Sequence, residues 1–142
     1  MRQIEWLVVH CSATMAKMDI GVHEIDRWHK DRGWAGIGYH YVIRRNGKIE
    51  KGRTEDKVGA HVKGYNSDSI GVCVVGGIDE QGHSEANYTP AQYHSLRQLL
   101  TDLKSRYPVA KLRGHRDFPN VHKSCPCFDV RAWWDDEINH SD

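Results

Sequence analysis

The sequence predicts an α/β fold in a single domain, with a central mixed β-sheet flanked by helices. The chain has 142 residues, of which 39% are hydrophobic, and this is enough for one domain with one core. Short apolar runs typical of buried strands alternate irregularly with segments of helical periodicity. A hairpin signal interrupts that alternation, which points to a mixed sheet. No repeat, low-complexity segment or linker divides the chain, so residues 1–142 are expected to form one domain.

The first elements are a strand and a short helix. Residues 4–10 (IEWLVVH) are an apolar, β-rich run that suits a buried strand ending at His10. Gly21 followed by Glu24 is typical of a helix start, helical spacing follows, and Gly33 supplies the stop. A histidine at the end of a strand would be rigidly held.

A β-hairpin is the clearest local signal in the chain. Residues 39–43 and 48–50 flank Asn46-Gly47, the dipeptide preferred in type I′ turns. Residues 70–75 (IGVCVV) then predict another buried strand.

The last third predicts a helix, a strand and a closing helix. Residues 89–92 (TPAQ) combine a capping box with proline at the first helical position. The leucines that follow form one helical face: Leu96, Leu99, Leu100 and Leu103. Residues 110–113 predict a strand, and residues 128–138, with Trp133 and Trp134, predict the closing helix.

Composition excludes several classes of function. The formal charge is +1, from 20 Lys and Arg against 19 Asp and Glu, so no global field favours nucleic acid or an anionic membrane as a partner. The apolar run at residues 6–9 is too short for a signal peptide or a membrane span, so synthesis in the cytoplasm is expected. The four cysteines do not resemble a disulfide framework, which leaves metal binding or burial as their expected use.

His115 and Cys125 are candidate metal ligands, and the strand-end His10 can complete a set of three. The segment between His115 and Cys125 contains Pro119 and must be a loop, which can fold both residues onto one ion. Three ligands with one open position are typical of a zinc hydrolase. On His115 and Cys125 alone, a strand-capping histidine and a small buried cysteine explain the pattern equally well.

Other ligand sets also fit the spacing. One rival set is His115, His122 and Cys125, and another is a structural site that uses Cys125 with Cys127. Closed structural sites usually show four ligands in paired spacing, and the chain has no Cys-x-x-Cys pair. His23 and His29 would lie on different faces of a helix and are expected to be surface or core residues.

Six short motifs occur in an order seen in a known family. They are residues 9–14 (VHCSAT), 38–41 (GYHY), 61–64 (HVKG), 70–72 (IGV), 89–92 (TPAQ) and 123–126 (KSCP). Through these motifs the chain resembles the type 2 N-acetylmuramoyl-L-alanine amidases, zinc enzymes related to the peptidoglycan recognition proteins. Within that family it is most similar to the small lysozymes of podovirus coliphages, which are phage endolysins.

The resemblance implies a role for specific residues. His10, His115 and Cys125 would bind one Zn²⁺, while Tyr39 and Lys123 would be the catalytic side chains. His61 would contact the substrate or support a ligand. Related recognition proteins that bind without cleaving typically lack the cysteine ligand, so Cys125 favours an enzyme. The other cysteines (Cys11, Cys73 and Cys127) match no ligand position. From residue type alone, Trp34, Tyr65 and Asn66 are candidates to line a groove for the glycan or the stem peptide, and core packing explains the tryptophan equally well.

The implied activity is hydrolysis of the amide between N-acetylmuramic acid and the L-alanine of the peptidoglycan stem peptide. The expected outcome is lysis of the host cell wall after the membrane has been permeabilised. A monomer is expected.

Two other functions remain open: a wall-binding module with a structural zinc, and inhibition of the phage RNA polymerase. In the family the polymerase contact partly uses an extension ahead of the first zinc histidine. This chain has only nine residues before His10, which puts the polymerase contact in doubt.

Overall fold

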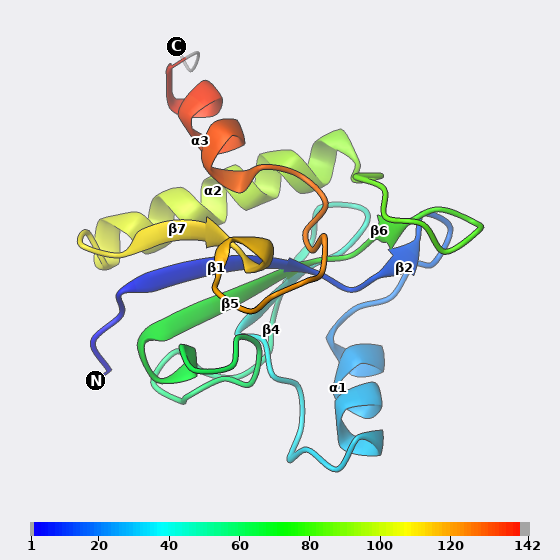
Figure 1. Cartoon of the computed structure of the whole chain (residues 1–142), viewed down its shortest axis with the longest axis horizontal. Coiled ribbons are helices and arrows are strands. Elements are labelled where there is room, and N and C mark those ends of the chain that lie inside the picture. Colours follow the sequence, from blue (N-terminus) through cyan, green and yellow to red (C-terminus); the bar gives the residue numbers. More distant parts are fainter. Residues whose placement is uncertain (1, 140–142) are drawn as a thin grey trace.

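The computed structural model describes residues 2–139, which form a single α/β domain around a five-stranded sheet in the order β4-β3-β5-β1-β7 (Figure 1). The strand β1 (Trp6–Cys11) is central and pairs in parallel with its two neighbours, β5 (Ser69–Val74) and β7 (Lys111–Gly114). The strand β3 (Tyr41–Ile43) extends the parallel part, and β4 (Ile49–Lys51) closes the edge as the antiparallel strand. The predicted mixed sheet is therefore confirmed.

A small second sheet continues beyond the carboxyl ends of β1 and β5. It consists of β2 (Thr14–Met15) and β6 (Gly77–Ile78), which pair in parallel. Sequence analysis missed both strands, because two-residue strands leave no periodicity to detect.

Helices cover both faces of the main sheet. On one face, α2 (Pro90–Arg106) buries its four leucines, as predicted, against alternate residues of β1 such as Leu7 and Val9. The closing helix α3 (Val130–Asn139) packs beside β7 on the same core and begins two residues later than predicted. On the other face, α1 (Val22–Asp31) packs Ile25 against a second cluster that includes Val42. Val8 and His10 point to this second face, since side chains alternate along a strand.

The local signals at the helix starts are confirmed. Thr89 accepts a hydrogen bond from the backbone N–H of Gln92, whose side chain reaches back to the N–H of Thr89. The Glu24 carboxylate likewise accepts from the N–H of Gly21. Each pair supplies partners for backbone groups that the helix leaves unbonded.

The predicted turn of the hairpin is wrong in type. A type I′ turn requires a positive φ at both central residues, but at Asn46-Gly47 only Gly47 has one, at 89°. The connection is longer: the N–H of Gly47 donates to the carbonyl of Arg44, and the N–H of Arg44 donates to the carbonyl of Lys48. The first hairpin strand is shorter than predicted, so that Tyr39 lies ahead of β3, and the second is shifted by one residue to Ile49–Lys51.

Two connections include single 3₁₀ turns, η1 (Asn66–Asp68) before β5 and η2 (His115–Asp117) after β7. Within residues 2–139, none of the helices has the length and apolar character needed to cross a membrane.

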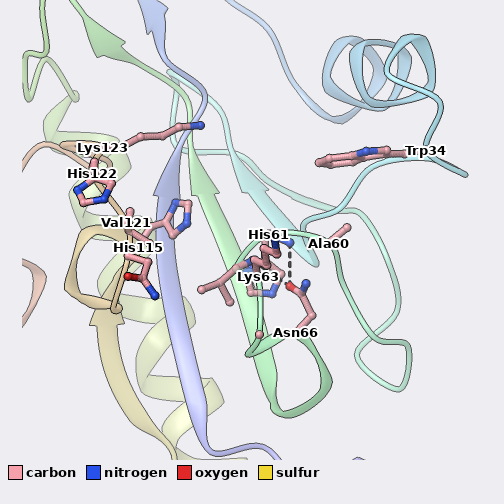
Figure 2. Close-up of a pocket in the computed structure, with 12 residues that line it drawn as sticks. Trp34, Ala60, His61, Lys63, Asn66, His115, Val121, His122 and Lys123 are labelled. Atoms are coloured by element: carbon pink, nitrogen blue, oxygen red, sulfur yellow. Dashed lines mark hydrogen bonds between the residues drawn. The ribbon is translucent and has the colours of Figure 1, made fainter.

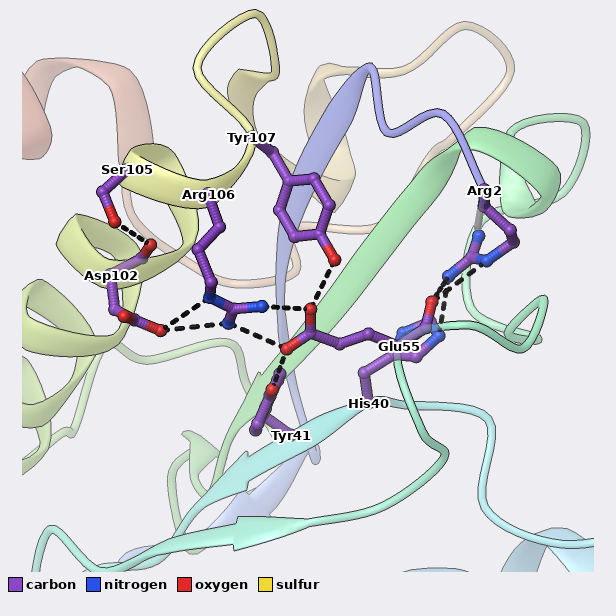
Figure 3. A network of polar contacts seen from close by, with 8 residues as sticks. All are labelled: Arg2, His40, Tyr41, Glu55, Asp102, Ser105, Arg106 and Tyr107. Carbon is purple, nitrogen blue, oxygen red and sulfur yellow. Dashed lines mark hydrogen bonds and ion pairs between the residues drawn. The ribbon is translucent and has the colours of Figure 1, made fainter.

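A carboxylate network fastens the loop after β4 to the end of α2 (Figure 3). The Glu55 carboxylate accepts hydrogen bonds from the two terminal guanidinium nitrogens of Arg106, at 2.6 and 2.9 Å. It also accepts from the hydroxyl of Tyr107 at 2.6 Å and from the hydroxyl of Tyr41. Arg2 donates to the backbone carbonyl of Glu55 at 2.8 Å. Burial would raise the pKa of Glu55, but the hydrogen bonds from Arg106, Tyr107 and Tyr41 outweigh it and lower the pKa to about 2. The network therefore holds an ionised carboxylate that is only 16% exposed.

We expect Glu55→Gln to lower the free energy of unfolding by about 1–3 kcal/mol at pH 7, since the variant loses charge-assisted hydrogen bonds. The folded-state pKa lies below the ordinary value of 4.5, so the ionised group stabilises the fold above pH 4.5. That contribution is lost as the pH falls from 4.5 toward 2. Urea unfolding at several pH values measures both effects.

Glu80→Gln is the matched control, because Glu80 is exposed. Its free energy of unfolding should equal that of the unchanged protein across the same pH range. An unchanged stability of Glu55→Gln at pH 7, or a deficit that persists undiminished in acid, would contradict the stabilising role of this network.

Candidate metal centre and adjoining cavity

Three candidate ligands converge at the carboxyl ends of two neighbouring strands. His10 is the penultimate residue of β1, His115 directly follows β7, and Cys125 lies in the loop before α3. One ligand atom from each lies within 4.8 Å of the others. Because β1 and β7 are adjacent and parallel, their carboxyl ends meet, and the two imidazole centroids are 4.4 Å apart. The cluster can hold a metal ion.

Backbone hydrogen bonds hold Cys125 at the cluster. The N–H of Arg116 donates to the carbonyl of Cys125 at 2.9 Å, which joins the loop to the turn that carries His115. The N–H of Cys11 donates to Cys125 Sγ at 3.1 Å, so the residue after His10 directly orients the third candidate ligand.

The rival ligand sets do not assemble. Among the His, Cys, Asp and Glu residues at positions 2–139, only His10, His115 and Cys125 form a group of three whose ligand atoms all lie within 4.8 Å of one another. His122 is exposed at the neighbouring cavity, and Cys127 donates instead to the carbonyl of Gly77 at 3.3 Å. His23 is not part of the cluster, and His29 is buried in α1, where it accepts a hydrogen bond from the N–H of Gly38.

The electrostatics suit neutral imidazole ligands. Burial lowers the pKa of His10 well below its ordinary value, and the neighbouring His61, His115 and Lys123 add to the effect. Burial and the charge of Lys123 also lower the pKa of His115. The Cys11 sulfur and burial raise the pKa of the Cys125 thiol. A bound cation would favour its thiolate, and metal binding would then release a proton.

His61 is not one of the three clustered candidate ligands, but it contacts His10 directly. His61 Nδ1 and His10 Nε2 share a hydrogen bond of 2.8 Å, and the two rings meet edge to face. On its other side, His61 Nε2 lies 3.2 Å from Ser69 Oγ. A Cβ at Gly71 would lie 2.7 Å from the imidazole, so glycine makes room for the ring. The backbone N–H of His61 also donates to Asn66 Oδ1, which fixes the loop.

Tyr39 lies between the metal cluster and α1. Its ring centroid is 5.1 Å from that of His10 and 5.5 Å from that of His29. Burial, reinforced by the nearby cysteines, raises the pKa of the Tyr39 phenol well above its ordinary value. The hydroxyl is therefore protonated near neutral pH.

A cavity of about 560 Å³ opens beside the cluster (Figure 2). His115 and Lys123 line one side, and His61 with Asn66 lines the other, while Trp34 stands at a separate edge. Lys123 is exposed, yet its charge acts on both His10 and His115.

Of the three predicted groove residues, Trp34 and Asn66 line this cavity, whereas Tyr65 packs on Trp6 and Phe118. Sequence reasoning missed Lys63, Asn120 and Val121 in the lining, because irregular loops carry no pattern that marks such residues.

Comparison with known proteins identifies a family whose members the chain resembles in sequence. The model of the N-acetylmuramoyl-L-alanine amidase family matches residues 1–128. The endolysin of Klebsiella phage KP32 is 57% identical over 91% of this chain and 84% of its own length. The endolysin of Escherichia phage T7 is 52% identical over 91% of this chain and 84% of its own length.

More distant similarity extends to recognition proteins and to solved structures. The peptidoglycan-recognition protein SC2 of Drosophila melanogaster is 30% identical over 92% of this chain and 74% of its own length. The solved structure of the N-acetylmuramoyl-L-alanine amidase LysC from Clostridium intestinale matches with a TM-score of 0.81 and 30% identity, covering 99% of this chain and 88% of that one.

Proposed function

Because the chain belongs to the N-acetylmuramoyl-L-alanine amidase family, we propose that it is a zinc-dependent phage endolysin acting on peptidoglycan. The bond cleaved is the amide between the lactyl group of N-acetylmuramic acid and the L-alanine of the stem peptide. The observation that carries the proposal is the convergence of His10, His115 and Cys125 beside an open cavity.

The donor set fits zinc. Two imidazoles and one thiolate match the nitrogen and sulfur ligands that Zn²⁺ prefers, and three protein ligands leave one position for water or substrate. The low pKa values of both histidines keep their ring nitrogens available for binding. When bound, zinc would act as a Lewis acid and would lower the pKa of water far enough to supply hydroxide as the nucleophile near neutral pH.

Lys123 supplies fixed positive charge at the mouth of the cavity. Attack on an amide carbonyl places negative charge on its oxygen, and an ammonium group stabilises that charge more than it stabilises the neutral carbonyl. Lys123 lines the cavity together with His115, and its charge lowers the pKa of both histidines of the cluster, which supports this role.

Tyr39 provides a protonated hydroxyl next to His10. Its raised pKa makes it a poor general base and a suitable hydrogen-bond donor to the substrate carbonyl or to the leaving nitrogen. Tyr39→Phe removes only the hydroxyl, so zinc should stay bound while turnover falls.

His61 has two proposed roles. Its place in the cavity lining supports the expected contact with substrate. Its hydrogen bond to His10, backed by Ser69, supports a further role in orienting the first ligand. Partners of this kind fix the ring orientation of metal-binding histidines.

We expect His61→Ala to weaken zinc binding by about 10–100-fold, as is usual when the hydrogen-bond partner of a histidine ligand is removed. Competition with a chromogenic chelator measures the affinity. His94→Ala, at an exposed histidine on α2, is the control and should bind zinc normally. Equal zinc affinities in the two variants would leave His61 with the substrate role alone.

Digestion of purified peptidoglycan tests the proposed activity. Mass spectrometry should find stem peptides with a free L-alanine amino group and intact glycan strands, and only in the zinc-loaded sample. Cleaved glycan would mean a different bond specificity. No release with zinc bound would favour a wall-binding module, for which Tyr39→Phe and Lys123→Met would change nothing.

The place of action and the partners complete the proposal. We expect synthesis in the host cytoplasm and access to the wall after permeabilisation, so purified protein should lyse permeabilised cells and spare intact ones. A phage RNA polymerase as second partner and a monomeric state stay predictions. A pull-down with the polymerase and sedimentation analysis test them.

A further inference from the structure

Three of the four cysteines meet at the carboxyl end of β1. The backbone N–H of Cys11 donates to Cys125 Sγ at 3.1 Å, which places these two cysteines in direct contact. Cys11 and Cys127 also pack on the same glycine: a Cβ at Gly77 would lie 2.7 Å from Cys11 Sγ, and Cys127 Sγ donates to the Gly77 carbonyl. Cys11 is therefore the shared neighbour of a metal ligand and of a second thiol.

The cluster is partly exposed through the two cysteines of the loop before α3. Cys11 is 8% exposed, and Cys125 and Cys127 are half-buried in the loop that borders the metal centre. Cys73 is different, because it is fully buried in the separate core cluster that faces α1. The chain thus contains one remote thiol and three thiols grouped at the ligand loop.

We propose that Cys11, Cys125 and Cys127 form an oxidation site for small hydroperoxides, at which a Cys11–Cys125 disulfide competes with metal binding. The metal part rests on the proposed zinc site, whereas disulfide formation does not. A cysteine that shares an electron pair with another sulfur has no thiolate to offer a metal, so oxidation removes one ligand of the three.

The chemistry balances with hydrogen peroxide as oxidant. One thiolate attacks the peroxide, forms a sulfenic acid and releases hydroxide, and the second sulfur then displaces the hydroxyl group to form the S–S bond. Two thiols lose two electrons and two protons, and the peroxide becomes two molecules of water. When Cys125 starts as a metal ligand, the metal ion is released in the same process.

Cys127 gives Cys11 an alternative partner. A Cys11–Cys127 disulfide leaves Cys125 free to bind metal, so the two possible disulfides have opposite effects on the metal centre. Removal of Cys127 should direct oxidation to Cys125 and speed metal release.

Peroxide treatment of the zinc-loaded protein, of Cys11→Ser and of Cys127→Ser tests the proposal. Zinc release is followed with a chromogenic chelator, and disulfides are mapped by mass spectrometry without reduction. We expect the Cys11–Cys125 link as the main product in Cys127→Ser, with faster release than in the unchanged protein. Cys11→Ser should release zinc about tenfold more slowly, because it lacks the neighbouring thiol that closes the disulfide.

Two outcomes would overturn the proposal: equal rates of release with and without Cys11, or no Cys11–Cys125 link in Cys127→Ser. Disulfides are also mapped in the unsubstituted protein after a chelator has stripped it. This part of the test depends neither on zinc nor on the folding of a variant. Zinc content before oxidation separately tests the proposed metal centre, so failure of one proposal is distinguishable from failure of the other.

Discussion

Cys125→Ser is expected to remove zinc and amidase activity together. A neutral hydroxyl replaces the only ligand that can carry negative charge, so the site keeps two imidazoles and loses its thiolate. The loss of zinc affinity should exceed the roughly 10–100-fold that accompanies loss of an outer hydrogen-bond partner. Elemental analysis after dialysis gives the zinc content, and release of stem peptides gives the activity.

Cys127→Ser is the matched control. It lies two positions away in the same loop, and its sulfur contacts the Gly77 carbonyl instead of joining the ligand cluster. This variant should keep one zinc ion and its activity in reducing buffer. Full zinc content and full activity in Cys125→Ser would remove Cys125 from the ligand set and with it the proposed centre.

Lys123→Met is expected to lower kcat on the order of 10²–10³-fold while zinc stays bound. The change keeps a long apolar side chain and removes the charge proposed to stabilise the oxyanion, an effect of about 3–4 kcal/mol at comparable sites. Because the charge acts mainly in the transition state, kcat should fall more than KM rises. Steady-state kinetics on a soluble muropeptide separates the two constants.

Two further variants make the Lys123 result interpretable. Lys123→Arg keeps a positive charge and should recover part of kcat. Lys48→Met removes an exposed lysine in the hairpin turn and should leave kinetics unchanged. A Lys123→Met protein with normal kcat would show that this lysine is a surface charge without a catalytic role.

Local sequence signals predicted most of the fold because each rests on nearby residues. The capping box at Thr89, the leucine face of α2 and the apolar runs of β1 and β5 all describe interactions within one element or burial on its faces. The turn at Gly47 was misassigned, because the turn type depends on the length of the connection and not on the Asn-Gly dipeptide alone.

The site was predicted unevenly for a similar reason. Strand ends placed His10 and His115, but spacing alone could not choose Cys125 over its rivals, since a loop can fold in many ways. Periodicity placed Tyr39 in a hairpin strand, and only the family resemblance pointed to the site, where its ring in fact packs near His10. The contact of Cys11 with Cys125 joins residues far apart in sequence, so no local pattern could reveal it. The resemblance itself is confirmed by the family match.

The pairing of Cys11 with Cys125 spans 114 positions, and it sits on the same strand end as His10. During synthesis, the candidate ligand His10 therefore emerges long before the candidate ligand Cys125. The strand β1 likewise lacks its β7 partner until residues 111–114 have been added. The three candidate ligands can therefore come together only after the strand that carries His115 into place has been made.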